Sequence, residues 1–165
     1  MRTILSALLL LVTFACTAKE TSEFDIFGVQ IGHKSPDRIV EGRATNSSFL
    51  LVAVPLKSKP FQDAMHNVNV FIFPKNKIVA ALRGDRVFST RDECDRAKLT
   101  IESELKKAYP KAYSGLDRRF RFESKDGKVV AGVICENTIP FPRLILEVNN
   151  PQLEAELMGT FRATP

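Results

Sequence analysis

The cysteines are the residues of this chain with the clearest chemistry. Cys94 and Cys135 stand well inside the sequence, whereas Cys16 ends an N-terminal apolar run. Two cysteines in an oxidising compartment predict one disulfide, Cys94–Cys135, which closes a loop of about 42 residues and contributes roughly 4 kcal/mol in the chain-entropy model. The alternative is two separate buried thiols. No Cys-x-x-Cys pair is present, which argues against a redox role.

The other ionisable side chains match no catalytic or metal motif. The two histidines, His33 and His66, lack both the His-x-x-x-His spacing of a zinc site and the context of a Cys–His nucleophile. Asp92, Glu93 and Asp95 fall in the first turn of an expected helix, where acidic residues complement the helix dipole. No serine stands in a Gly-x-Ser-x-Gly setting. We therefore expect no enzyme, no cofactor and no metal site.

Three arginines, Arg118, Arg119 and Arg121, are the candidate binding surface. They are interleaved with Phe120 and Phe122, a pattern that also suits a basic, aromatic binding strip. Alternation in a strand, however, puts the two residue types on opposite faces, so the plainer interpretation is a core face and a solvated face. Three further phenylalanines are expected in the core: Phe71, Phe73 and Phe141.

The N-terminal residues have the build of a secretory signal peptide. Arg2 gives a positive start, an apolar run over residues 4–15 follows, and small residues precede a cut after Ala18. The run is shorter than the about 20 apolar residues that span a bilayer. A cut after Ala15 would instead leave Cys16 for lipid attachment, although the residues before it match a lipobox poorly. We expect a periplasmic or secreted protein whose only membrane attachment is a lipid on Cys16.

Length and charge set further bounds on the mature chain. Residues 1–18 are expected to be removed, and residues 19–165 are long enough for a single domain. The net charge of +5 becomes +4 without Arg2. This excess favours an acidic partner such as an anionic lipid headgroup, a glycan or a protein surface, or else a basic surface with no specific partner. Nucleic acid is not an expected partner of an exported chain without a binding motif.

The clearest element is a helix that begins after Thr90. Thr90 and Glu93 form a capping box, and apolar residues recur at spacings of three and four up to Ala108. Tyr109-Pro110 ends the helix, because proline disfavours helix in the residue before it. Cys94 lies on the apolar face of the first turn, where a bond to the end of a strand is geometrically reasonable.

Apolar alternation and continuous apolar runs predict seven strands: residues 24–31, 49–54, 68–73, 78–82, 119–123, 129–135 and 144–148. For the fourth strand, a longer alternative runs on past Gly84 to Phe88. Tight turns are expected at residues 74–77 and 125–128, and short helices at residues 35–42 and 151–158. Residues 57–66 are expected to form either a loop or one helical turn after Pro60. Short connections make neighbouring strands antiparallel. We expect an α+β fold in which helices pack on one face of an antiparallel sheet, with two helix-plus-three-strand halves, 24–88 and 89–159, as a finer division.

The opening Phe27-Gly28-Val29-Gln30-Ile31-Gly32, placed before a Ser-capped helix, carries a family resemblance. Together with the helix-then-strands order and the export signal, it resembles small exported bacterial proteins of the β-lactamase-inhibitor-like architecture, also seen in an outer-membrane assembly lipoprotein. The resemblance implies a binding module, since that architecture usually serves protein–protein recognition. It carries over no functional residue.

We therefore expect an exported, non-enzymatic envelope protein that binds another protein through a sheet face or interstrand loops, as an inhibitor, immunity or assembly protein. The alternative is a periplasmic carrier of a lipid or small hydrophobic ligand, which the twelve phenylalanines suggest. A large enclosed apolar cavity would favour the carrier. A filled core with an exposed apolar patch would favour a protein partner.

Overall fold

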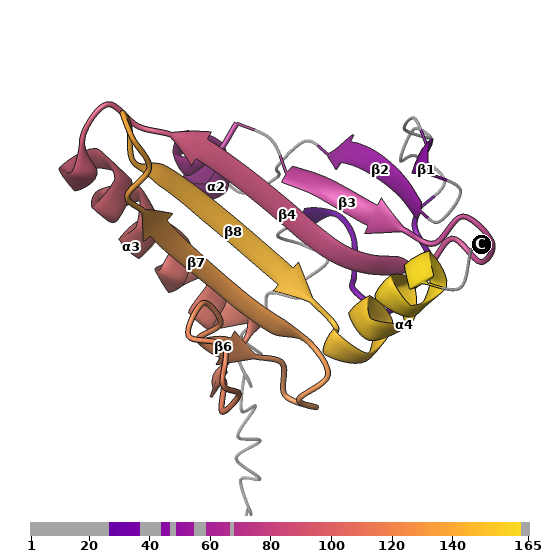
Figure 1. Cartoon of the computed structure of the whole chain (residues 1–165). Coiled ribbons are helices and arrows are strands. Elements are labelled where there is room, and N and C mark those ends of the chain that lie inside the picture. Colours follow the sequence, from indigo (N-terminus) through magenta and orange to yellow (C-terminus); the bar gives the residue numbers. More distant parts are fainter. Residues whose placement is uncertain (1–26, 37–43, 47–48, 55–58, 67, 163–165) are drawn as a thin grey trace, which may run out of the picture.

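The centre of the computed structural model is one antiparallel sheet (Figure 1). The structure describes residues 27–36, 44–46, 49–54, 59–66 and 68–162. Its strands are β1 (Ala44–Asn46), β2 (Phe49–Val54), β3 (Val68–Ile72), β4 (Val79–Val87), β5 (Lys111–Ala112), β6 (Phe122–Glu123), β7 (Val130–Glu136) and β8 (Arg143–Asn149). Its helices are α2 (Lys59–Ala64), α3 (Arg91–Ala108) and α4 (Pro151–Arg162). The predicted α+β class is confirmed.

The eight strands follow the order β1-β2-β3-β4-β8-β7-β6-β5. Two meanders, β1 to β4 and β5 to β8, thus join where β4 pairs with β8, in a register that runs from Ala81 opposite Asn149 to Val87 opposite Arg143. The expected division into a helix followed by three strands is too simple. Helix α2 lies between β2 and β3, and four strands follow α3. The sequence missed β5 and β6 as separate strands because two residues are too few for an alternating pattern.

The core lies between the sheet and the pair α2 and α3. Alternate residues of the central strands, such as Leu82 in β4 and Leu146 in β8, are fully buried against Ile101 and Leu105 of α3. Helix α3 begins as predicted, because the Thr90 side chain accepts a hydrogen bond from the Glu93 amide and the Glu93 carboxylate accepts one from the Thr90 amide. Burial of the apolar side chains between the sheet and these two helices provides most of the driving force for folding.

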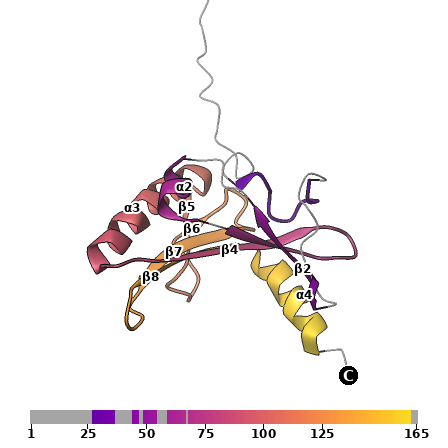
Figure 2. The same ribbon diagram turned by 90° about the horizontal axis from the view of Figure 1, so that it is seen from above.

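Helix α4 lies on the opposite face of the sheet from α2 and α3 (Figure 2). Its Glu154 pairs with Arg83, whose side chain points away from the core face because it follows buried Leu82 in β4. The expectation that all helices share one face is therefore wrong for α4. An amphipathic pattern indicates that a helix has a buried side, but it does not say which face of a sheet that side meets.

The segment before β1 departs from the expected strand at 24–31. Phe27, Val29 and Ile31 are buried as alternation requires, yet residues 28–33 form bends and turns. Gly28 and Gly32 have positive φ angles of 70° and 80°, which interrupt an extended chain. Residues 24–26, and the expected helix after its first two residues, lie outside the described part of the chain.

Other elements lie close to their predicted positions. Strand β2 matches 49–54, β3 ends one residue early, and β4 runs to Val87 as the longer alternative required. The turns at 74–77 and 125–128 are present, and Gly127 has a positive φ of 73°. Helix α4 extends beyond residue 158 to Arg162. In the described ranges, no helix combines the length and apolarity needed to cross a membrane.

Candidate functional site

The predicted disulfide is present and clamps one end of the molecule. Cys94 lies in the first turn of α3 and Cys135 near the end of β7, with their Cα atoms 6.0 Å apart. Both residues are buried. The bond holds the start of α3 against the sheet, immediately before the chain leaves β7 for the loop that leads to β8. A disulfide fits a protein of an extracellular or periplasmic compartment.

The three candidate arginines do not form one surface. Arg119 lies 3.4 Å from Glu147, on the sheet face that α4 partly covers, whereas Arg121 lies 3.6 Å from Glu102 on α3. Arg118 is exposed and forms no ion pair with another described residue. The alternation expected of residues 119–123 fails because a turn joins Phe120 to Asp117 and only residues 122–123 are strand. Phe120 is nevertheless buried and Phe122 partly buried.

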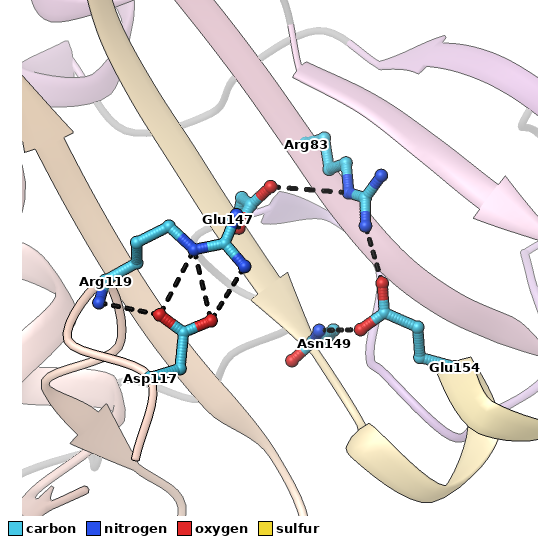
Figure 3. A network of polar contacts seen from close by, with 6 residues as sticks. All are labelled: Arg83, Asp117, Arg119, Glu147, Asn149 and Glu154. Atoms are coloured by element: carbon cyan, nitrogen blue, oxygen red, sulfur yellow. Dashed lines mark hydrogen bonds and ion pairs between the residues drawn. The ribbon is translucent and has the colours of Figure 1, made fainter. Parts of the chain in front are cut away.

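Arg119 belongs to a polar network on the face of the sheet opposite α2 and α3 (Figure 3). The members of this arginine network are Arg83, Asp117, Arg119, Glu147, Asn149 and Glu154. Arg83 donates to Glu154 at 2.5 Å and lies 3.6 Å from Glu147. Arg119 donates to Asp117 at 2.7 Å, and Asn149 donates to Glu154.

The network fastens two covering segments to the sheet. Glu154 ties α4 to β4 and β8, and Arg119 ties the loop at residues 113–121 to β8. Hydrogen bonds from Arg119 hold the pKa of the Asp117 carboxyl below its usual range, and Asp117 in turn raises the pKa of the Arg119 guanidinium. Every carboxylate of the network is thus paired with an arginine, which suits a structural tie.

Gly132 in β7 explains how closely the loop at 113–121 approaches the sheet. A Cβ at this position would overlap the Arg119 carbonyl oxygen and lie 2.9 Å from the Phe120 Cα. Only glycine leaves room for backbone to cross there. The loop therefore covers the middle of this face, and α4 covers the region around Arg83 and Asn149.

Uncovered apolar side chains gather at the end of the sheet where β7 turns into β8. Ile139 is fully exposed and Phe141 is half exposed, both in the β7–β8 loop at residues 137–142. Val87, at the end of β4, is 55% exposed and pairs in register with Arg143 at the start of β8. A hydrogen bond from the Phe88 amide to the Pro142 carbonyl holds β4 beside this loop. We refer to Val87, Ile139 and Phe141 as the apolar tip.

The β7–β8 loop is tied at several points. Arg91 of α3 donates to the Asn137 side chain at 2.7 Å and is itself held by Asp95 at 2.8 Å. Within the loop, the Thr138 hydroxyl donates to the Phe141 carbonyl. At its base, Arg143 pairs with Asp85 at 2.8 Å. These contacts, two prolines and the nearby disulfide restrain the backbone of the loop that carries Ile139 and Phe141, so little backbone conformational entropy is lost on binding.

Sequence reasoning missed this loop as a candidate site. Phe141 was expected in the core, with Phe71 and Phe73, which are partly buried. The available signal was the Ile139-Pro140-Phe141-Pro142 spacing, because prolines on both sides of an aromatic residue exclude a central strand. Cys16, the candidate lipid-attachment residue, lies outside the described part of the chain.

Two grooves on the surface of the described residues are lined by both polar and apolar side chains. One groove, of about 440 Å³, lies beside the apolar tip between α2, α3 and β4 and includes Asp63, Arg86 and Arg96. A second, of about 670 Å³, lies at the other end of the sheet and includes Lys107, Lys125 and Lys128. Within the described ranges, no three His, Cys, Asp or Glu side chains are grouped so that they could hold a metal ion.

Comparison with protein families, with curated proteins and with solved structures finds no significant match to this chain. The resemblance to the β-lactamase-inhibitor-like architecture therefore stays a prediction.

Proposed function

We propose that this protein is an exported, non-enzymatic binding module that recognises another protein of the cell envelope through its β7–β8 loop. The observation that carries the proposal is the apolar tip, in which Ile139 and Phe141 project into solvent from a tied loop. An inhibitor, an immunity protein or an assembly factor would use such a loop in the same way.

The physical support is the combination of exposure and restraint. Single exposed apolar residues are common on protein surfaces, but three at one end mark a candidate interaction site. A loop whose backbone is already restrained loses less entropy on association, which favours affinity. Aromatic and large aliphatic anchors seated in a partner's pocket typically dominate binding energy, whereas the surrounding polar rim adds complementarity.

Export is the second part of the proposal. The Cys94–Cys135 disulfide supports an oxidising compartment, and the N-terminal residues 1–18 have the pattern of a signal peptide. A lipid on Cys16 is the alternative outcome of processing. Mass spectrometry of the protein purified from its own cells distinguishes an N-terminus at Lys19 from a lipid-modified Cys16.

A carrier of a lipid or small hydrophobic ligand remains the alternative function. Such a carrier needs an enclosed apolar cavity between helix and sheet. The space between α3 and the described strands is instead filled by buried side chains, among them Ile101, Leu105 and Leu146. No specific contact in the described residues favours this alternative over the protein partner.

The test is affinity capture of three tagged proteins from the native envelope after mild crosslinking. The tagged wild-type protein is compared with Ile139→Asp/Phe141→Asp and with a control, Leu99→Asp/Leu116→Asp, in which two equally exposed apolar residues lie outside the tip. We expect one stoichiometric protein partner with the wild type and the control, and its loss with the tip variant. Equal capture by all three proteins would contradict the proposal, as would empty capture with a lipid bound to the purified protein.

A further inference from the structure

The described lysines are concentrated at the end of the sheet opposite the apolar tip. There β3 ends and β4 begins, around a turn with Lys75 and Lys77, and β6 leads into β7, around a turn with Lys125 and Lys128. Helix α3 ends at the same place with Lys106 and Lys107. Lys34 precedes this end of β4, and Lys111 donates to the Lys125 carbonyl. We refer to these eight residues as the lysine end.

Positive charge at the lysine end exceeds the negative charge beside it. Four described acidic residues lie there, Glu104, Glu123, Asp126 and Glu156. Two of these form ion pairs, with Lys107 and Lys128, and these two lysine side chains stay 56% and 71% exposed. By contrast, residues 85–98 beside the tip hold four basic and four acidic side chains. The excess charge of the described chain thus lies at the lysine end.

Lysine and arginine have different roles in this molecule. Several arginines at the tip and on the sheet face are paired with carboxylates, as Arg143 is with Asp85 and Arg83 with Glu154. Lysines sit on turns and on a helix end, where flexible, strongly hydrated ammonium groups project from several segments. This arrangement suits a broad anionic surface better than a single anion held in a built pocket.

The described chain begins at Phe27, whose ring packs against Phe61 of α2, and reaches the lysine end at Gly32, whose amide donates to the Val79 carbonyl. Residues 30–33 line the same groove as Lys107, Lys125 and Lys128. Only ten residues separate Cys16 from Phe27, and a chain of this length reaches at most about 40 Å when fully extended. A lipid on Cys16 would therefore hold the molecule close enough to a bilayer for the lysine end to reach the lipid headgroups.

We propose that the lysine end docks on an anionic phospholipid bilayer. Helix α3, whose 18 residues span about 27 Å, runs from the tip to this end and would separate the β7–β8 loop from the membrane. The loop would then point away from the bilayer, toward a protein partner. This inference does not depend on the proposed protein partner, because the two surfaces share no residue.

The test is co-sedimentation of the purified protein with vesicles of phosphatidylcholine alone and with vesicles in which about one lipid in three is phosphatidylglycerol. We expect preferential binding to the anionic vesicles, weakened as ionic strength rises from about 0.05 to 0.5 M because the charges are screened. Comparison of the two vesicle types isolates the electrostatic contribution even if Cys16 carries a lipid.

A matched pair of variants locates the surface. Lys107→Gln/Lys125→Gln/Lys128→Gln is expected to weaken binding to the anionic vesicles by about a hundredfold, at about fivefold for each lysine. Lys59→Gln/Arg96→Gln/Lys98→Gln removes the same charge beside the tip and should change binding by less than about threefold. Equal weakening by both variants, or no preference for anionic vesicles, would overturn the inference. Unchanged melting temperatures confirm that both variants fold, and capture by the tip is a separate readout.

Discussion

The two ends of the sheet use their exposed surface differently. At the apolar tip, Arg91 and Arg143 form ion pairs that hold the chain, and the exposed apolar side chains are the distinctive feature of the surface. At the lysine end, the turns are short and polar, and positively charged side chains dominate the surface. The comparison indicates that a candidate site is better located by the side chains that stay exposed, and by their charge, than by counting residues of one type in the sequence.

The same comparison separates stability from function. Exposed ion pairs typically contribute about 0 to 1 kcal/mol each, so the arginines fix geometry more than they stabilise the fold. Stability comes from the core under α2 and α3 and from the disulfide. The predictions below range from substitutions that loosen one end to substitutions that should leave stability unchanged.

Loss of the disulfide should give the largest effect on stability. Cys135→Ser is expected to lower the free energy of unfolding of the oxidised protein by about 2–5 kcal/mol, because the unfolded chain is no longer restrained. Chemical denaturation measures this change, and reduced wild-type protein is the control that should match the variant. An unchanged melting temperature would show that the bond does not restrain the chain.

A substitution in the middle of the sheet should lower the free energy of unfolding by less than loss of the disulfide does. Gly132→Ala places a Cβ against the backbone of Arg119 and Phe120, so the loop at 113–121 must shift, at a cost of about 1–3 kcal/mol. Gly127→Ala is the control, since a side chain there meets nothing within 4 Å and only the positive φ opposes it, at about 1 kcal/mol. A smaller cost at Gly132 than at Gly127 would contradict the close packing of this loop.

The arginine network should give a small, pH-dependent effect. The pKa of Asp117 is lowered in the folded protein, chiefly by the hydrogen bond from Arg119, so its contribution is present above pH about 4 and is lost as the pH falls through the folded-state pKa. Asp117→Asn should therefore reduce the free energy of unfolding by no more than about 0.5 kcal/mol at neutral pH. Urea titrations of both proteins near neutral pH and in strong acid measure this difference. A difference that persists in strong acid would argue against the pairing.

The apolar tip should give the smallest effect on stability. Ile139 is fully exposed and Phe141 is half exposed, so both side chains contribute little to the buried core. We therefore expect Ile139→Asp/Phe141→Asp to change the free energy of unfolding by less than about 0.5 kcal/mol. The contrasting variant is Leu144→Ala, since Leu144 is fully buried at the same end of the sheet. It should lower the free energy of unfolding by about 2–5 kcal/mol. Thermal unfolding of the two variants measures both effects. A large loss from the tip variant would mean that the tip supports the fold.

Local rules account for the parts of the fold that the sequence predicted. Thr90 and Glu93 define the start of α3, and the runs at 49–54 and 68–73 predict β2 and β3, because each signal lies within a few neighbouring residues. The disulfide followed from cysteine number and compartment. These elements needed no knowledge of the tertiary arrangement.

The rest depends on contacts between distant residues. The alternation of Phe27 and Ile31 with less apolar residues predicts a strand. In the structure, both side chains are buried, but they belong to a segment of turns that packs beside β4. The face of the sheet on which α4 packs depends on the ion pair between Arg83 and Glu154. Arg119 and Arg121 point in different directions because the chain between them crosses closely over Gly132. The exposure of Phe141 likewise depends on tertiary context, since composition makes a phenylalanine a core residue by default.

Site-specific photo-crosslinking in the native envelope tests the central claim most directly. A photo-activatable amino acid replaces Ile139 in one protein and the equally exposed Leu116 in another. The proposed function predicts one discrete protein adduct from position 139 and none from position 116. Adducts that are the same from both positions, lipid adducts from position 139, or no protein adduct there would contradict a protein-binding role for the β7–β8 loop.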